Sequence, residues 1–108
     1  MIASGCTEIG ECTFFGCENL QTVELPEGLL RIGKEAFRDC EALAAITLPD
    51  GLQEIGAEAF RYCEHKDLKL HIPDSVTEIG ENAFADVPCI IYHGPAQSDD
   101  NWGAKSRN

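Results

Sequence analysis

Apolar and polar residues alternate in three short segments of the chain, and each of these segments ends at a proline. In the first, Val23 and Leu25 alternate with Thr22 and Glu24 before Pro26. A period of two is typical of a β-strand with one buried face, and proline ends such a strand because it lacks an N–H donor. We therefore predict strands near Leu20–Leu25, Leu43–Leu48, Leu68–Ile72 and Ile90–Tyr92.

A longer repeat joins these segments into units. Isoleucine–glycine pairs recur at steps of 23, 23 and 24 residues, at Ile9-Gly10, Ile32-Gly33, Ile55-Gly56 and Ile79-Gly80. At fixed offsets they are followed by Phe14, Phe37, Phe60 and Phe84, and then by Cys17, Cys40, Cys63 and Val87. A repeat of this length indicates a solenoid, because a single unit cannot bury its apolar face whereas stacked units form a continuous core.

The predicted fold class is an α/β solenoid, a right-handed coil with a parallel β-sheet on one face and short helices or turns on the other. A segment such as Lys34–Cys40 is too short to be a stable helix unless packing holds it. Phe37 and Phe60 are expected to anchor the core. The four glycines of the isoleucine–glycine pairs precede the predicted helical turns, where a side chain would restrict the backbone.

The solenoid is expected to span residues 1–94 in about four units, the first truncated at Ile2, with a capping tail over 95–108. The third unit is one residue longer, and Lys66 stands where the second unit has Leu43. We expect a bulge there, with Leu68 filling the gap. At the far end, Trp102 is expected to fold back over the core.

Charge narrows the range of partners. The chain has 19 acidic and 8 basic side chains, for a formal net charge of −11. This balance argues against binding to nucleic acid or to an anionic membrane surface, and it fits a partner with a basic face. No apolar run is long enough to span a bilayer, and the N-terminus lacks the features of a signal peptide. The chain is therefore either cytoplasmic or accompanied by a leader outside this sequence.

The six cysteines are explained best by the repeat. Cys17, Cys40 and Cys63 hold one repeat position, so we expect a column of buried thiols that donate weakly to loop carbonyls. Parallel side-chain directions disfavour disulfides, and the spacing does not bring metal ligands together. Cys6 is expected in the core and Cys12 on the surface as a reactive thiol, while Cys89 has no assigned position.

Neither a catalytic site nor a metal or cofactor site is predicted. His65, His71 and His93 fall at three different repeat positions, so they share no face. The abundant carboxylates are interpreted as a solvated surface, since acid–base catalysis needs a pocket. Asp99-Asp100-Asn101 lacks the spacing of a calcium loop.

The motif Ile-Gly-x-x-Ala-Phe-x-x-Cys-x-x-Leu-x-x-Ile-x-Leu-Pro at 32–49 resembles the BspA-like, or treponemal-type, leucine-rich repeat, and the resemblance extends from Ile2 to about Gly94. Thr13, Val87 and the enlarged third unit depart from the pattern. The resemblance implies a curved parallel-sheet solenoid without catalytic activity. It also implies a cell-surface or secreted bacterial protein that binds host or bacterial proteins.

The leading hypothesis is a protein-binding module. Its outward strand positions form two columns on the predicted sheet face: Thr22, Ala45 and Lys69, and Glu24, Thr47 and His71. The alternative is a structural spacer or a self-assembly segment, which would associate through an exposed N-terminal edge around Ile2, Cys6, Phe14 and Phe15. An enzyme that uses Cys12 or Cys89 is the least favoured hypothesis.

Overall fold

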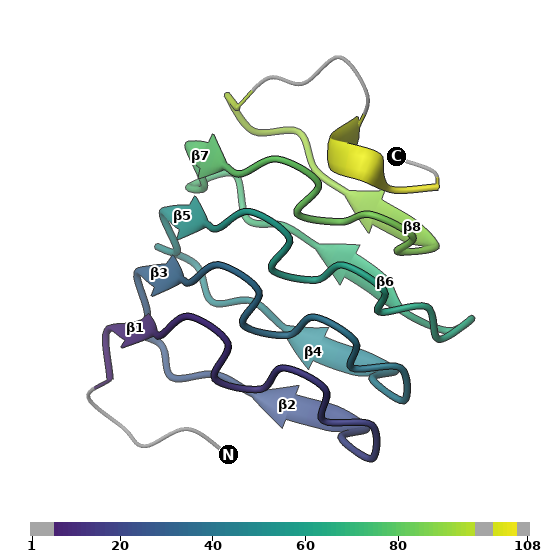
Figure 1. Cartoon of the computed structure of the whole chain (residues 1–108). Helices are drawn as coiled ribbons and strands as arrows, with labels where there is room; N and C mark the ends of the chain where they lie inside the picture. Colours follow the sequence, from purple (N-terminus) through teal and green to yellow (C-terminus); the bar gives the residue numbers. More distant parts are fainter. Residues whose placement is uncertain (1–5, 97–100, 106–108) are drawn as a thin grey trace.

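A computed structural model describes residues 6–96 and 101–105. The chain winds into stacked coils that carry two rows of short strands (Figure 1). One row contains β2 (Thr22–Glu24), β4 (Ala45–Thr47), β6 (Lys69–His71) and β8 (Cys89–Ile91). The other contains β1 (Glu8–Ile9), β3 (Arg31–Ile32), β5 (Glu54–Ile55) and β7 (Glu78–Ile79). Every strand pairing is parallel, which confirms the predicted parallel solenoid.

Of the predicted short helices or turns, the structure has turns. Within residues 6–96 and 101–105, the single helix is the 3-10 turn η1 (Asn101–Gly103). In the segment predicted to be helical, Glu35 and Asp39 adopt left-handed conformations with φ of 57° and 63°, which interrupts a right-handed helix. The N–H groups of Glu35 and Phe37 donate to the next coil, to Ala57 O at 3.0 Å and Ala59 O at 2.7 Å. Backbone groups that a helix would pair internally are thus paired between coils.

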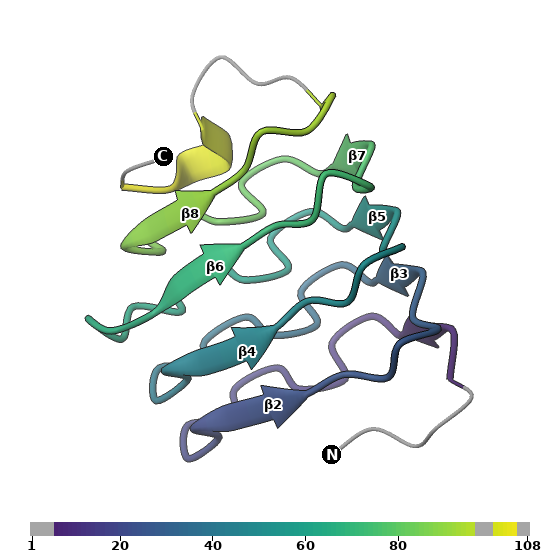
Figure 2. The ribbon, with the colours of Figure 1, turned by 180° about the vertical axis from the view of Figure 1, so that it is seen from behind.

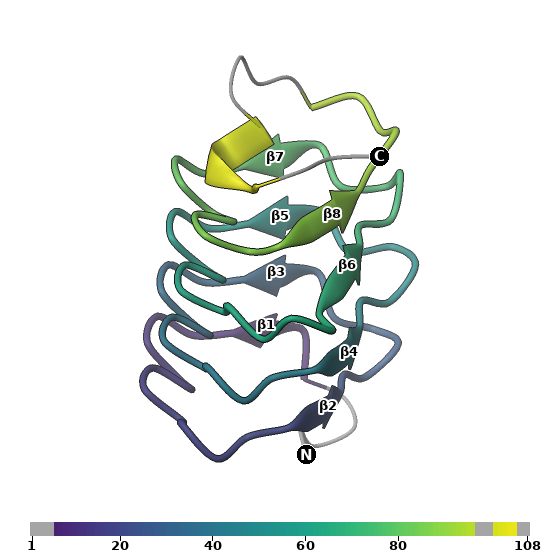
Figure 3. The same cartoon turned by 90° about the vertical axis from the view of Figure 1, so that its right-hand side faces the viewer.

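The second row of strands was not predicted. β1, β3, β5 and β7 form a four-stranded sheet in which the isoleucines of the repeat lie in register. Figure 3 shows that this row lies on a different side of the coil from β2, β4, β6 and β8. Each of its strands has two residues, too few to show an alternating pattern. The expectation of one sheet opposite short helices or turns is therefore corrected to two rows of strands joined by turns.

The enlarged third unit interrupts the first row. β4 and β6 lie side by side (Figure 2), but the ladder is divided into two-stranded sheets, β2–β4 and β6–β8. Lys66 is exposed and Leu68 is fully buried. The extra residue therefore carries the lysine outward and brings the leucine into the core position, as predicted.

A stack of phenylalanine rings forms the centre of the core. The centroids of Phe14 and Phe37, and of Phe37 and Phe60, are 5.1 Å apart with nearly parallel planes. Phe60 and Phe84 continue the stack at 6.0 Å. Phe37 and Phe60 are fully buried, which confirms them as core residues.

The predicted thiol column lies beside this stack. Cys40 Sγ donates to Phe14 O at 3.1 Å, and Cys63 Sγ donates to Phe37 O at 3.0 Å. Both cysteines are buried and neither forms a disulfide. Hydrogen bonding with Cys40 and burial raise the pKa of Cys63, so this thiol stays protonated. Cys17, in the first described coil, is only partly buried.

Close contact between coils requires glycine at three of the four isoleucine–glycine pairs, whereas a Cβ on Gly10 would make only an ordinary contact with Thr13 Oγ1 at 3.5 Å. A Cβ on Gly33 would lie 2.8 Å from the backbone of the preceding coil, and a Cβ on Gly56 would lie 2.6 Å from it. At Gly80 the distance would be 2.2 Å. The sequence predicted the need for glycine but gave a different reason, a restriction on the backbone before a helix.

The two ends of the solenoid differ. At the C-terminal end Trp102 is buried, and its ring meets those of Phe84 and Tyr92 edge-on at 6.4 and 5.7 Å. Phe84 N donates to Trp102 O at 3.0 Å and Asp86 N to Gly103 O at 3.2 Å. These bonds continue the pattern found between coils, so Trp102 and Gly103 take the place of a further turn.

The first described coil is more exposed. Phe14 is partly buried and Phe15 is 45% exposed. Cys6, predicted in the core, is also only partly buried, and its Sγ donates to Glu8 O at 3.0 Å. Ile2, Asp99 and Asp100 lie outside the described residues. In the described part of the chain, no helix has the length and hydropathy needed to cross a membrane.

Candidate binding face

The six side chains predicted to form the binding face are all exposed in the structure. They lie on β2, β4 and β6, on the side of the coil seen in Figure 2. Thr22 pairs in register with Ala45, and Glu24 pairs with Thr47. The residues are Thr22, Glu24, Ala45, Thr47, Lys69 and His71. We call this set the strand face.

Sequence reasoning missed the contribution of β8. Cys89 pairs in register with Lys69, and Ile91 with His71. Cys89 and Ile91 therefore continue the two outward columns, and both are partly buried. The step from Lys69 to Cys89 is 20 residues instead of 23 or 24. This shortened last step removed the repeat signal that would have placed Cys89.

Charge changes along the strand face. β2 carries Glu24, β4 carries the neutral Ala45 and Thr47, and β6 carries Lys69 and His71. One end of the face is therefore acidic, the middle is small and neutral, and the next coil carries the basic side chains. Such an arrangement favours one orientation of a bound partner over the reverse.

A groove adjoins the strand face where β2 and β4 end. It has a volume of about 810 Å³ and is lined by Glu24, Leu25, Glu27, Thr47, Leu48, Pro49 and Asp50. Glu24 and Thr47 belong to both the face and the groove. We call this site the strand-end groove. It was not predicted, although the sequence places an acidic residue directly after each of Pro26, Pro49 and Pro73.

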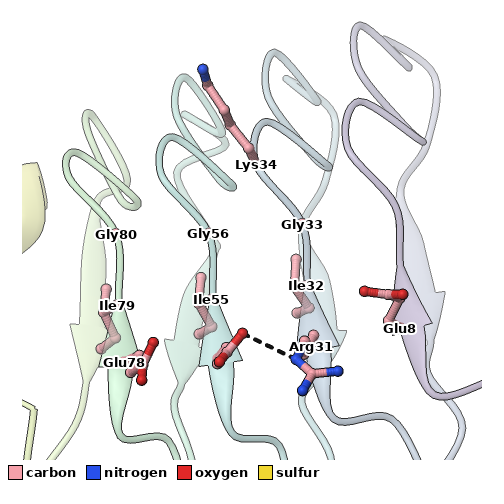
Figure 4. Close-up of a pocket in the computed structure, with 11 residues that line it drawn as sticks. Glu8, Arg31, Ile32, Gly33, Lys34, Ile55, Gly56, Glu78, Ile79 and Gly80 are labelled. Atoms are coloured by element: carbon pink, nitrogen blue, oxygen red, sulfur yellow. Dashed lines mark hydrogen bonds and ion pairs between the residues drawn. The ribbon is translucent and has the colours of Figure 1, made fainter.

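A smaller groove of about 390 Å³ follows the four-stranded sheet (Figure 4). Its lining combines the residues of the isoleucine–glycine pairs with four charged strand residues, Glu8, Arg31, Glu54 and Glu78, and with Lys34. Arg31 Nε pairs with Glu54 Oε2 at 3.2 Å, as the dashed line shows. This groove therefore carries an internal ion pair, unlike the strand-end groove.

Comparison with known proteins assigns the fold to a family. Residues 1–93 match the model of the BspA type leucine rich repeat region in six copies. The chain belongs to the BspA-type leucine-rich repeat family. Among curated proteins, no sequence gives a significant match.

Two solved structures are similar to this BspA-type chain. A leucine-rich repeat protein of T. pallidum is 33% identical, with a TM-score of 0.61 over 79% of this chain and 51% of that one. A leucine-rich repeat protein from Bacteroides ovatus is 27% identical, with a TM-score of 0.73 over 99% of this chain and 36% of that one. The present chain thus spans about half and about a third of their lengths.

The turns of this BspA-type solenoid carry a cluster of arginines and carboxylates. Arg38 Nη1 contacts Glu35 Oε2 at 2.5 Å and Glu58 Oε1 at 2.7 Å, and Arg61 Nη1 lies 3.3 Å from the same Glu58 oxygen. The guanidinium of Arg61 lies 4.7 Å from the ring centroid of Tyr62. The Arg38–Glu58 pair links successive coils, and both arginine charges are already compensated within the chain.

Cys12 was predicted to be a reactive surface thiol. It is exposed, and its Sγ lies 3.9 Å from Glu35 Oε1. Desolvation and the negative charges of Glu35 and Glu11 raise the pKa of Cys12 above its ordinary value. A raised pKa lowers the thiolate fraction on which reactivity depends, so the structure weakens this prediction.

Two further groups of polar residues contain potential metal ligands. Glu11, Cys12 and Glu35 place three candidate ligand atoms within 4.8 Å of one another, on an open surface. The histidines remain separate: His65 Nδ1 accepts from Asp67 N at 3.1 Å, His71 lies on β6, and His93 is exposed beyond β8. Neither group lies in the strand-end groove.

Proposed function

We propose that this chain is a non-catalytic protein-binding module whose strand face recognises a protein partner. One observation carries the proposal: all six outward strand residues are exposed side by side on parallel strands, next to a groove of about 810 Å³. Backbone pairing and the core fix these strands before binding. A preorganised surface of this kind loses little conformational entropy when a partner binds.

The family supports this function. BspA-type leucine-rich repeats are generally protein-interaction scaffolds, and solenoids present extended surfaces for binding. Ala45 and Thr47, in the middle of the face, are small enough to let a partner approach the sheet closely. We also propose that the protein is a surface or secreted protein of a bacterium, as members of this family commonly are.

Selection of phage-displayed random peptides on the immobilised chain tests the proposal. The affinities of selected peptides are then measured for Ala45→Trp, which obstructs the face, and for Thr77→Trp, which adds the same bulk at an exposed position elsewhere. We expect a loss of about tenfold or more for Ala45→Trp alone, which corresponds to about 1.4 kcal/mol. Failure to enrich any peptide, or equal losses in the two variants, would contradict the proposal.

A second candidate function is self-association through the first described coil. Phe14, Cys17 and Leu20 are only partly buried there, whereas Phe37, Cys40 and Leu43 at the same repeat positions are fully buried. Phe15 adds an exposed apolar ring. An end of this kind can accept another coil, either from a longer chain or from a second copy.

A further inference from the structure

The strand-end groove differs in charge from the smaller groove on the four-stranded sheet, because Arg31 and Lys34 line only the smaller one. The strand-end groove is a concave site of about 810 Å³, within the usual size range of ligand pockets, and it lies between two successive coils. Leu25, Leu48 and Pro49 supply apolar lining, while Glu24, Glu27 and Asp50 supply three carboxylates. Its lining contains no lysine, arginine or histidine. The groove is therefore negative.

The three groove carboxylates are also unpaired. Within residues 6–96 and 101–105, Glu24, Glu27 and Asp50 make no ion pair and no side-chain hydrogen bond. The arginines of the described chain are engaged elsewhere: Arg31 on the four-stranded sheet, and Arg38 and Arg61 on the turns. Among the described residues no cation thus compensates the groove charge, and the groove is available to a cation from outside.

We propose that the strand-end groove receives an extended, lysine- or arginine-bearing segment of the protein partner. This inference rests on the proposed function and names the chemistry of the partner. Alternate side chains of an extended segment point to the same side. Two basic residues separated by one other residue can therefore face Glu27 and Asp50. These two carboxylates stand at one repeat position on neighbouring coils, directly after Pro26 and Pro49. The neutral Thr47 and the partly exposed Leu25 contact the stems of these side chains.

The position of the groove gives the segment a direction. Glu24 belongs to both the groove and the strand face, whereas His71 occupies the corresponding position on β6. The attraction for a basic segment therefore falls from β2 and β4 towards β6, where Lys69 repels it. A bound basic segment lies over the first two coils.

A defined peptide tests this inference. The probe is a fluorescent peptide of alternating lysine and threonine with blocked ends, and its glutamate–threonine counterpart serves as the negative control. Binding is compared in Glu27→Gln/Asp50→Asn and in Glu8→Gln/Glu78→Gln. Both double variants remove two negative charges, but the second acts on the four-stranded sheet, so the variants have the same net charge.

We expect the groove variant to weaken binding about fivefold to tenfold, because it removes two exposed charge pairs of modest strength, and the control variant less than about twofold. Equal losses in both variants would reduce the effect to general attraction by the net charge and overturn the proposal. No binding to the wild type, or no loss in the groove variant, would also overturn it. If phage selection yields peptides that need Ala45 but are indifferent to Glu27 and Asp50, the proposed function survives and this inference does not.

Discussion

The two ends of the solenoid contain the same type of ring in different surroundings. At the C-terminal end, Phe84 is fully buried beneath Trp102, whose backbone also accepts the Phe84 N–H. In the first described coil, Phe14 stacks on Phe37, is partly buried, and among the described residues has no ring on its other side. The comparison shows that a repeat residue contributes to stability according to its neighbours on both sides, so identical motifs are not energetically identical.

The largest difference in stability is expected between two truncations, one of a ring in the middle of the stack and one of a ring in the first described coil. We expect Phe60→Ala to lower the free energy of unfolding by about 3–5 kcal/mol, the usual range for a buried phenylalanine. Phe14→Ala should cost about 1–2 kcal/mol, because its ring buries less area. Urea denaturation of both variants measures the difference. Similar losses would mean that the first coil is as well packed as the middle.

Removing the indole tests the cap directly. Trp102→Ala should lower the free energy of unfolding by about 3 kcal/mol, because it uncovers the rings of Phe84 and Tyr92. Trp102→Phe keeps an aromatic ring and should recover most of that loss. The melting temperatures of the two variants report the effect. An unchanged melting temperature in Trp102→Ala would show that the tail does not act as a cap.

Changes at the two ends of the solenoid should have opposite effects on self-association. If the first coil is the adhesive end, Phe15→Glu should reduce the mass measured by light scattering at high protein concentration. Phe15 is exposed, so the substitution should leave the melting temperature nearly unchanged. Truncation from Gly94 onward should expose a second apolar end and raise the mass. If only the truncated chain assembles, and the Phe15 variant matches the wild type, the ends have been assigned the wrong roles.

The cysteines should differ in how fast they react with iodoacetamide. Under native conditions, iodoacetamide should leave Cys40 and Cys63 unlabelled, because both are buried. Cys12 should react more slowly at neutral pH than an unperturbed thiol, because its pKa is raised. Glu35→Gln removes a negative charge, lowers that pKa and should speed labelling of Cys12, whereas Glu41→Gln should not. Mass spectrometry of the labelled peptides gives the rates, and an unchanged rate in Glu35→Gln would contradict the electrostatic account.

The parts of the fold that could be predicted are those in which the same type of side chain recurs at the same position of each repeat. The alternation before each proline located β2, β4 and β6, and the fixed offsets identified Phe37, Phe60 and the thiol column. The turns could not be predicted, because Glu35 and Tyr62 adopt positive φ although such residues rarely do. Their conformation follows from backbone bonds between coils, which no single segment encodes.

The candidate site was also predictable in part. The strand face followed from alternation, since outward positions on a one-sided strand are fixed by the period. The strand-end groove was missed because it is formed by residues of two coils that meet only after stacking. Glu27 and Asp50 are 23 residues apart in the sequence. Cys89 was missed because the last step between strands is shorter than the repeat.

The bonds between turns have a consequence for how such a chain can change in length. The N–H of Cys12 donates to Lys34 O, that of Glu35 to Ala57 O and that of Glu58 to Glu81 O, each at 3.0 Å. Because these three bonds between turns use equivalent donors and acceptors, duplicating or deleting one whole unit of 23 residues restores an equivalent bond between turns. Recombination between repeats in the gene can therefore lengthen or shorten the solenoid while these bonds between turns are kept. Trp102 lies outside the repeated units, so adding or removing a unit leaves a single copy of it, packed on the last coil.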